Sequence, residues 1–480
     1  MTLSSASKSK RHRAAGNVSG PGAPVVVIGL VLFAAMTSLL GGSSRFDAVQ
    51  NGALRPMAAL FLIPAMYWYS KAKMKDVSAP MVLLGLAALW TAIQLIPLPS
   101  GLWHMLPGRG VIANVDAIHG LEDTWRPISY VPMRGWNALT AMVVPAAAGL
   151  LALSLRPSLR TLLYVITGIG LFDALLGLLQ VIGDPNGPLY FYAITNNGSP
   201  VGVFANENHS GVFSGIALLV IARLGLIERN RHGADGVNIA LVATFLIVTL
   251  AILVSGSRAA LGLGLAAYFA VALMVWLSLK RPDLAGDAAG PGALIVRYPR
   301  LSIALGVTLA GGLLLALMQF ERAPGVVDAL NQNAFEDLRW RIGSILISMM
   351  STHWLFGTGF GSWDAVYQIA EPTGFMGLAY VNQAHNDWAQ LVIEGGVPAI
   401  LLVLAFMRWA AFSLRQIFAR RPAALARCVF WLAILAILAA ASLVDYPLRT
   451  PIFQVVAIWL AIALAFDARD NKAASPSKLK

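Results

Sequence analysis

Membrane-length apolar runs dominate this chain and constrain its fold more than any other feature. A helix of about 17 to 25 mainly apolar residues crosses a hydrocarbon core of roughly 30 Å. The chain contains twelve such runs, at residues 24–41, 53–70, 79–98, 136–154, 161–182, 211–227, 237–255, 259–279, 301–318, 397–414, 426–444 and 451–467. They predict an all-α polytopic membrane protein of about twelve transmembrane helices. Only 12% of the residues are charged, against roughly 25% in an average soluble domain.

The distribution of basic residues tests this count of spans, because Lys and Arg accumulate in short cytoplasmic loops. With a cytoplasmic N-terminus, every inner segment contains Lys or Arg, and all nine lysines lie on the inner side. The net charge of +12 is thus spread over the inner segments, which indicates membrane topology rather than nucleic-acid binding. The same alternation predicts a cytoplasmic C-terminus and three longer outer segments, at 99–135, 183–210 and 319–396.

The predicted organisation is one membrane domain between two short tails. Residues 1–20 and 471–480 are polar and rich in Ser and Lys, so we expect disordered cytoplasmic tails. The membrane domain covers 21–470 and includes the large outer loop 319–396, between spans nine and ten. In that loop the pattern predicts one amphipathic helix over Leu338–Met350 and a second from near Asn382 to Gly395-Gly396. We expect both to lie on or partly within the bilayer surface, above a cavity among the spans.

Several signatures of soluble-substrate chemistry are missing from the sequence. It has no glycine-rich phosphate loop ending in Gly-Lys-Ser/Thr, no Cys-x-x-Cys pair and no His-Glu-x-x-His motif. It also lacks Asp-x-Asp, the usual carboxylate pair for a metal-bound nucleotide sugar. We therefore expect no metal and no cofactor.

Polar residues gather instead at the predicted outer ends of spans, so segments far apart in sequence share one side and depth of the membrane. They are Asn206, Asn208 and His209; Ser255, Ser257 and Arg258; and Arg339, Arg341, His385, Asn386 and Asp387. Every basic residue assigned to the outer side is arginine, whose planar fork grips phosphate oxygens in pairs. A genome that favours Arg over Lys would give the same asymmetry.

Four stretches give the chain a resemblance to the O-antigen ligase and O-antigen polymerase superfamily, which includes bacterial O-linked oligosaccharyltransferases. They are Phe204–Gly211, with an Asn-x-Asn-His motif; Ser257-Arg258-Ala259-Ala260; Arg341 with Gly357-Thr358-Gly359-Phe360-Gly361; and His385-Asn386 with Glu394 and Gly396. The resemblance covers most of residues 80–465 and rests on their order and spacing. Ala389 and Ala399 stand where the family often has Leu and Gly.

The resemblance implies a glycosyltransferase of the bacterial inner membrane, with its active site on the periplasmic face. It would move a glycan from undecaprenyl diphosphate to an acceptor hydroxyl without metal, as a surface-polysaccharide polymerase or an O-antigen ligase. A sugar hydroxyl needs a base at neutral pH, and His385 fits that role. Arg258, Arg339 and Arg341 would stabilise the leaving diphosphate, and the remaining substrate-binding candidates are Asn206, Asn208, His209 and Asn386. Lipid A-core, a growing glycan and a protein hydroxyl all remain possible acceptors.

Simpler interpretations compete at each position. His385 could be a surface or capping residue, Arg258 could extend from a span end to the interface, and Asn206, Asn208 and His209 could cap the sixth span. Asp173 lies inside the fifth span, where we expect it to face a wet cavity. At the level of the whole chain, the rival function is a twelve-span transporter or glycolipid flippase, and a third is a non-catalytic scaffold. A transporter predicts ionisable residues near the midplane in both halves, and Asp173 has no evident counterpart.

Overall fold

The computed structural model is a bundle of long helices with a smaller helical cap at one end. It describes residues 21–69, 79–229, 235–279, 333–375, 381–419 and 424–469, with side chains left out at 235 and 333–341. Its elements, in chain order, are α1 (Ala23–Leu40), α2 (Val49–Leu60), α3 (Leu62–Tyr67), α5 (Ala79–Ile93), β1 (Pro97–Leu98), α6 (Ser100–His104), α7 (Gly110–Ile118), β2 (Arg126–Pro127), α8 (Pro132–Ala141), α9 (Val143–Leu155), α10 (Leu159–Ile182), α11 (Glu207–Glu228), α12 (Asp235–Val254), α13 (Arg258–Leu279), α17 (Asn333–His353), α18 (Trp363–Ala370), the 3-10 turn η2 (Thr373–Phe375), α19 (Asp387–Phe418), α20 (Ala424–Val444), the 3-10 turn η3 (Pro447–Arg449) and α21 (Pro451–Arg469).

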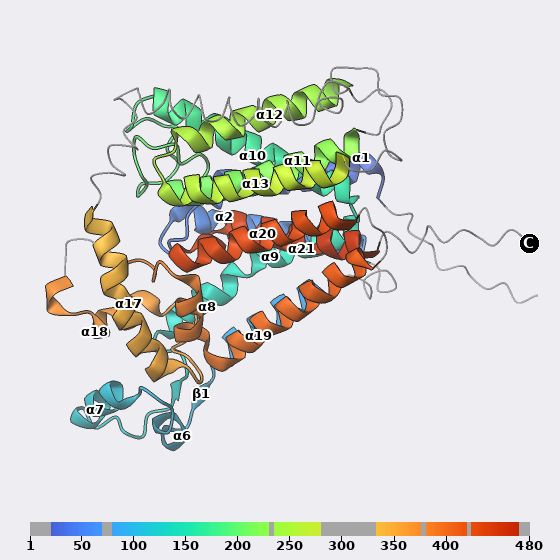
Figure 1. The fold of residues 1–480 in the computed structure, drawn as a ribbon. Helices are drawn as coiled ribbons and strands as arrows, with labels where there is room; N and C mark the ends of the chain where they lie inside the picture. The colour runs from blue at the N-terminus through green and yellow to red at the C-terminus, as the bar shows by residue number, and fades with distance from the viewer. Residues whose placement is uncertain are drawn as a thin grey trace, which may run out of the picture.

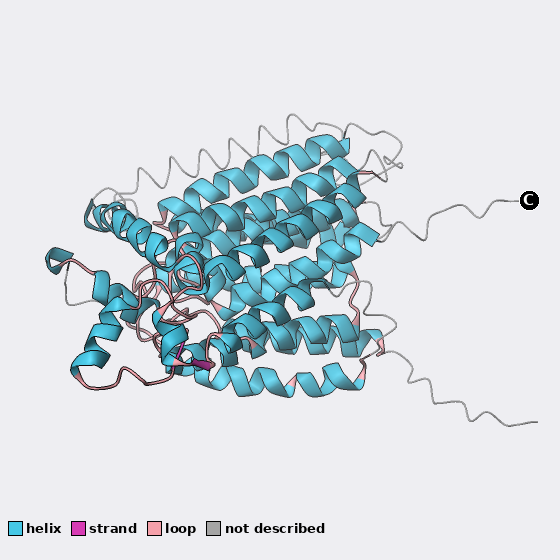
Figure 2. Ribbon diagram, turned by 90° about the horizontal axis from the view of Figure 1, so that it is seen from below, coloured by secondary structure: helices cyan, strands magenta, loops and turns pink. Residues whose placement is uncertain are grey.

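The long helices run side by side and define two ends of the molecule (Figures 1 and 2). We call one the loop end; it carries the segments 97–131, 183–206, 255–257, 357–375, 381–386 and 445–450. We call the other the basic end; within a few residues of the helix ends there lie Arg156, Arg160, Arg229, Arg415, Arg427 and Arg469. Helices α10, α12 and α20 run towards the loop end, and α9, α11, α13, α19 and α21 run away from it.

The described helices confirm the predicted class of an all-α polytopic membrane protein. Nine of them are long and apolar enough to cross a membrane, if α8 and α9 are taken as one span. The predicted span 53–70 is divided at Phe61 into α2 and α3, and the predicted span 79–98 is the 15-residue helix α5. The predicted span 301–318 and both predicted tails lie outside the described residues.

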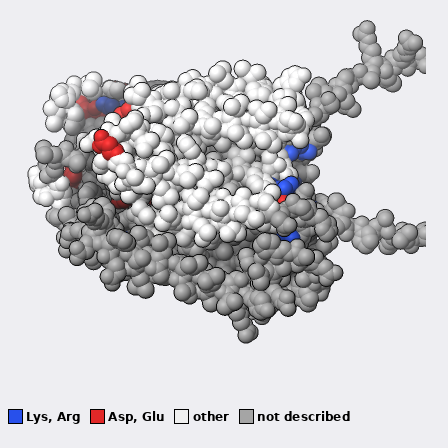
Figure 3. Space-filling view, turned by 90° about the horizontal axis from the view of Figure 1, so that it is seen from above, with Lys and Arg blue, Asp and Glu red and all other residues white. Residues whose placement is uncertain are grey.

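The bundle holds together through one large apolar core that α9, α10, α11, α20 and α21 share. Leu162, Phe213, Phe430 and Trp459 are among its fully buried side chains. The face of the bundle seen in Figure 3 is uncharged along its middle: Lys and Arg side chains lie at one end, acidic side chains with a basic one lie near the other, and the described surface between them carries no charged side chain. This charge-free belt is what a bilayer requires of a spanning protein.

The cap at the loop end has its own, smaller core. Helices α17 and α18 pack against the start of α19 through Ile342, Leu346, Trp363 and Ile393. Helix α17 agrees with the helix predicted over Leu338–Met350 but is longer at both ends. The helix predicted to begin near Asn382 begins at Asp387 and continues through a kink at Gly396 to Phe418. His385 therefore precedes the helix instead of lying in its first turns.

Candidate functional site

His385 lies in a tight turn just before α19. Its φ is +49°, a left-handed conformation that is uncommon in residues other than glycine. The turn is held on both sides: Gln390 accepts a hydrogen bond from the Ala384 N–H (2.9 Å), and the Asn386 side chain caps α19 by accepting from the Ala389 N–H (3.0 Å). Strained backbone of this kind is common at functional sites. In this turn the His385 side chain is 19% exposed.

Asp445 connects three segments that are far apart in sequence. One of its oxygens lies 3.5 Å from His209 Nε2 and 3.8 Å from His385 Nδ1. Its other oxygen accepts a hydrogen bond from the Asn208 amide (2.9 Å), and the Asn208 oxygen in turn accepts from the Ser257 hydroxyl. The Tyr446 ring lies edge-on to both imidazoles, with centroid distances of 5.1 Å. The predicted outer-end motifs around residues 206–211, 255–258 and 385–387 therefore meet around one carboxylate.

The two histidines differ in access. The His209 side chain is only 2% exposed, whereas the His385 side chain is 19% exposed. Neither ring nitrogen of His209 has a hydrogen-bond partner among the described residues. Of the two imidazoles, only that of His385 is partly open to a substrate hydroxyl, whereas that of His209 is buried.

Two of the predicted binding residues have structural roles. The Asn206 side chain caps α11 by accepting from the Asn208 N–H (2.8 Å), as the Asn386 side chain caps α19. Each side-chain oxygen already accepts one hydrogen bond, but each amide group can still donate. The capping interpretation therefore fits Asn206 and Asn386, whereas Asn208 links Asp445 to Ser257.

The expectation that Asp173 faces a wet cavity is wrong. Asp173 is fully buried in α10, where it accepts hydrogen bonds from the Val203 N–H and the Ser210 hydroxyl (both 2.9 Å). A Cβ on Gly202 would come within 1.9 Å of its carboxylate, so the loop packs directly on it. Asp173 thus fastens the segment that carries Asn208 and His209 to the bundle.

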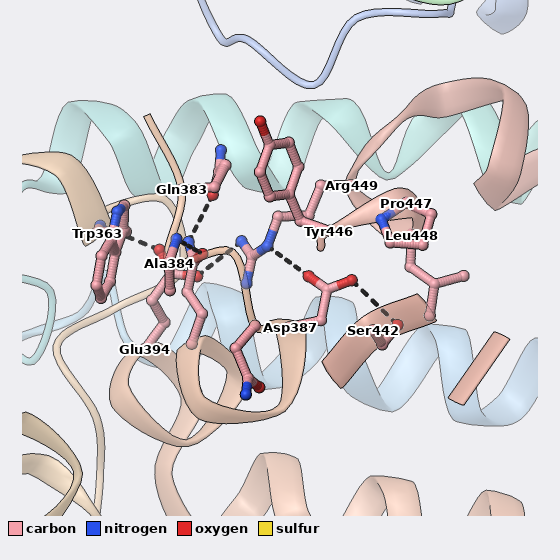
Figure 4. A network of polar contacts seen from close by, with 12 residues as sticks. Trp363, Gln383, Ala384, Asp387, Glu394, Ser442, Tyr446, Pro447, Leu448 and Arg449 are labelled. Carbon is pink, nitrogen blue, oxygen red and sulfur yellow. Dashed lines mark hydrogen bonds and ion pairs between the residues drawn. The ribbon is translucent and has the colours of Figure 1, made fainter. Parts of the chain in front are cut away.

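A second polar network lies beside His385, at the start of α19 (Figure 4). Arg449, in η3, donates to Asp387 (2.9 Å) and to Glu394 (3.0 Å), and Asp387 also accepts from the Ser442 hydroxyl (3.3 Å). Burial opposes the charged form of Arg449, but the carboxylates of Glu394 and Asp387 outweigh burial and raise the pKa of the guanidinium. Arg449 therefore remains a cation beside the two carboxylates.

Glu394 extends this network to the glycine-rich turn 357–361. Its carboxylate accepts from the Gly361 and Trp363 N–H groups (both 3.1 Å), and its carbonyl accepts from the Gly359 N–H (3.0 Å). Gly357, Gly359 and Gly361 all have positive φ, and a Cβ on Gly357 would lie 2.2 Å from the Glu394 carbonyl oxygen. These glycines are packing and turn residues, as expected for close contact between two backbones.

Arg109 anchors the same turn from the opposite side. It is buried, lies over the Tyr130 ring (4.1 Å to the centroid) and donates to the carbonyls of Ile128 (2.9 Å) and Gly357 (3.3 Å). Burial lowers its pKa to about 10, so it stays charged at neutral pH. Burial, together with the charge of Arg109, lowers the pKa of His353 to about 4, which keeps His353 neutral.

The three predicted diphosphate-binding arginines lie at the loop end but are described to different extents. Arg258 begins α13, one residue after Ser257, and is exposed. Arg339 and Arg341 lie on α17, which packs against α19, and their side chains are outside the described part of the structure. Among the side chains that are described, no three His, Cys, Asp or Glu residues group as a metal site would require.

Asp445, Tyr446 and Arg449 were not predicted from the sequence. They lie in a six-residue connection, 445–450, between the last two spans. A signal was present: two charged residues stand between two long apolar runs, where charge is costly unless it is paired or used. Their partners in residues 208, 387 and 394 could not be identified without the fold.

The fold and this site define a class: a polytopic helical membrane protein with a buried polar cluster at one end of its bundle. A family model described as O-antigen ligase matches residues 243–404, about a third of the chain. The match includes Arg258, Arg339, Arg341 and His385, and it confirms over that range the resemblance to the O-antigen ligase and polymerase superfamily. It indicates a glycan-transferring enzyme of this type. The search of curated proteins found no match.

Proposed function

We propose that the protein is a glycosyltransferase of the bacterial inner membrane that works at the periplasmic face. It moves a glycan from undecaprenyl diphosphate to an acceptor hydroxyl, without metal. The observation that carries the proposal is the position of His385: an accessible imidazole in a strained turn, 3.8 Å from Asp445, within the region that matches the O-antigen ligase family. The loop end then faces the periplasm, and the membrane domain is a single functional unit over residues 21–470.

In the proposed reaction His385 is the base. The acceptor hydroxyl gives its proton to an imidazole nitrogen while its oxygen attacks the anomeric carbon of the donor sugar. The bond from that carbon to the phosphate oxygen breaks, and the lipid diphosphate leaves with the electron pair. Asp445, 3.8 Å from His385, stabilises the imidazolium that forms, as a carboxylate does beside a catalytic histidine in other enzymes. Asp445 is a positioning residue in this scheme.

The diphosphate needs cations, because its negative charge grows as it leaves. We assign diphosphate binding to Arg258, Arg339 and Arg341, which lie at the loop end within the region that matches the O-antigen ligase family, while Arg449 is held by Asp387 and Glu394. Arg258 is exposed one residue from Ser257, and Ser257 is linked through Asn208 to Asp445. This chain of contacts supports a donor site between α13 and the His385 turn.

For the acceptor, we favour a surface polysaccharide, by polymerisation or ligation, over a protein hydroxyl. The reaction needs the same base and the same leaving group whether the acceptor is lipid A-core, a growing glycan or a protein. The residues around His385 therefore do not distinguish among these three acceptors. The transporter alternative is less well supported, since Asp173, an ionisable residue inside a span, has no evident counterpart in the sequence and is bonded internally to Val203 and Ser210.

The test is transfer by purified protein in lipid vesicles, with a polyprenyl-diphosphate glycan as donor. His385→Ala should lower turnover by at least about 100-fold, since general base catalysis contributes roughly 10²–10⁴-fold. The donor should still bind, because His385 is not among its ligands. His119→Ala is the matched control: His119 is an exposed histidine at the same end of the bundle, and its loss should leave turnover unchanged. Full turnover in His385→Ala would refute the proposed base, and addition of EDTA tests metal independence.

A further inference from the structure

Residues 97–131 form a small lobe at the loop end, which we call the β1–β2 lobe. Its base is a two-residue antiparallel pairing, Pro97 with Pro127 and Leu98 with Arg126. Helices α6 and α7 lie between the two strands and project from the side of the cap (Figure 1). Arg109 and Tyr130 attach the lobe to the turn 357–361: the Tyr130 N–H donates to the Thr358 carbonyl (2.8 Å).

Helix α7 buries its acidic residue and exposes large apolar side chains, together with the polar Asn114. Its acidic residue, Asp116, is only 3% exposed. Val111, Val115 and Ile118 are 58%, 49% and 80% exposed. These three follow an i, i+4, i+7 pattern, so they form one continuous apolar face on the side of the helix away from Asp116.

The polar contacts explain why α7 is turned this way. Asp116 forms an ion pair with Arg126 at the base of the lobe. Arg109, at the N-terminus of α7, reaches across to the Gly357 carbonyl (3.3 Å). Asp116 thus holds α7 against the base of the lobe, and Arg109 holds the lobe against the cap. The opposite side of α7, with Val111, Val115 and Ile118, therefore faces outwards.

Further apolar side chains of the lobe are exposed. Leu102 in α6, Met105 directly after it, and Leu121 and Trp125 after α7 are each about half exposed or more. Several large apolar side chains exposed in one small lobe indicate contact with a membrane or another protein. Tryptophan and long apolar side chains with a polar reverse side are typical of helices that lie at a membrane interface.

The lobe also connects directly to a helix with a lipid-facing stripe. Val82, Leu86, Leu89 and Ile93 are exposed along one side of α5, and Ile96 continues the stripe into the connection to β1. Only four peptide steps separate Ile93 from Pro97, so the base of the lobe lies at most about 14 Å from the end of α5. The base of the lobe therefore lies close to the end of the stripe on α5, at the boundary of the bilayer.

We propose that the β1–β2 lobe rests on the bilayer at the loop end. The face formed by Val111, Val115 and Ile118 inserts at the boundary between lipid headgroups and acyl chains. The occupant of this face is therefore lipid. Since Arg109 and Tyr130 join the lobe to the turn 357–361, and Glu394 joins that turn to Arg449, the lobe sets the height of the polar cluster relative to the headgroups.

The chain is suited to a direct test, because Cys428 is its only cysteine and is buried. In a Cys428→Ser background, nitroxide labels are attached to single cysteines at Val115 and Ile118, and the protein is reconstituted in lipid nanodiscs. Collision with oxygen, which partitions into lipid, is compared with collision with a water-soluble nickel chelate. At both positions oxygen should dominate, as at the control Leu404 on the exposed apolar side of α19. At Asp123, an exposed acid in the same lobe, the nickel chelate should dominate.

Two outcomes would overturn the proposal. If Val115 and Ile118 resemble Asp123 in nanodiscs, the face lies in water. If they are open to the chelate in nanodiscs but protected from a polar thiol reagent in native membranes, the occupant is a protein partner and not lipid. Each labelled variant is used only if its thermal unfolding midpoint matches that of the parent, so that a misfolded lobe is not mistaken for a water-exposed one.

Discussion

Arg449 shows how a single side chain can hold two buried carboxylates next to a site. It donates to Asp387 at the first residue of α19 and to Glu394 two turns later, both before the kink at Gly396. Glu394 is completely buried, and removing only its cationic partner would leave its charge unpaired. The contribution of the Arg449–Glu394 ion pair to stability therefore cannot be divided between the two residues.

We expect Arg449→Met to lower the free energy of unfolding by about 3 kcal/mol, the lower end of the range for breaking a buried ion pair, because the Arg449 side chain is 21% exposed. Adding Glu394→Gln should restore part of the loss, since the amide needs no cation. The measurement is thermal or denaturant unfolding of the purified protein in lipid. Arg45→Met is the control: Arg45 pairs with the exposed Asp47, and its loss should cost less than about 1 kcal/mol. Equal effects of the two substitutions would show that the Arg449 pairs contribute little.

For individual residues, the sequence predicted which motifs lie near the site better than it predicted the role of each side chain. The motifs around residues 206–211, 257–258 and 385–386 could be placed at one common end of the spans, because hydropathy and charge predict depth and side. The Asn206 and Asn386 caps could not be separated from binding residues, since a cap and a ligand use the same side-chain oxygen. Asp445 and Arg449 were missed because their importance comes from partners far away in sequence.

At the scale of elements, the break in α19 determines how the cap meets the bundle. Gly396 has φ +62° and ψ −158°, a conformation essentially restricted to glycine. A Cβ on Gly396 would lie 2.7 Å from the Leu355 carbonyl oxygen. A Cβ on Gly395 would lie 2.4 Å from the Cβ atom of Ala399. The alanine at 399 thus fills the space beside Gly395. Sequence alone indicated an end to the helix at Gly395-Gly396, but not that the chain continues as a kinked helix, because Pro398 and two glycines fit either outcome.

Gly396→Ala should reduce the stability of the fold by about 1 to 3 kcal/mol from backbone strain, and by more if the contact with residue 355 does not relax. Turnover should fall as well, since Glu394 and His385 lie on the same short stretch of chain. Thermal unfolding and glycan transfer are measured on the same preparation. Gly343→Ala is the matched control, because Gly343 lies inside α17 with open space around it and should gain slightly in helix stability. Unchanged unfolding in Gly396→Ala would mean that the kink is not required.

For the whole molecule, the hydropathy pattern was the most reliable guide. Apolar runs and basic loops predict where spanning helices lie and in which direction they run, because a bilayer constrains both. The described helices alternate as predicted, and the basic residues Arg156, Arg229, Arg415 and Arg469 share one end. The sequence could not give the lateral order of helices, which places α13 and α20 against α11. That order depends on side-chain fit between neighbouring helices, which no periodicity encodes.

The proposed function requires that the loop end faces the periplasm and the basic end the cytosol. In a Cys428→Ser background, a single cysteine at Asp123 reports on the loop end, and one at Ala419, the exposed residue that ends α19, reports on the basic end. A membrane-impermeant maleimide added to intact spheroplasts should label the cysteine at 123 and not the one at 419, because Lys and Arg retain the basic end on the cytoplasmic side. After the membrane is permeabilised, both should react. The reverse pattern in intact spheroplasts would place His385 in the cytosol, away from a periplasmic acceptor, and the assignment of the reaction to that face would have to be abandoned.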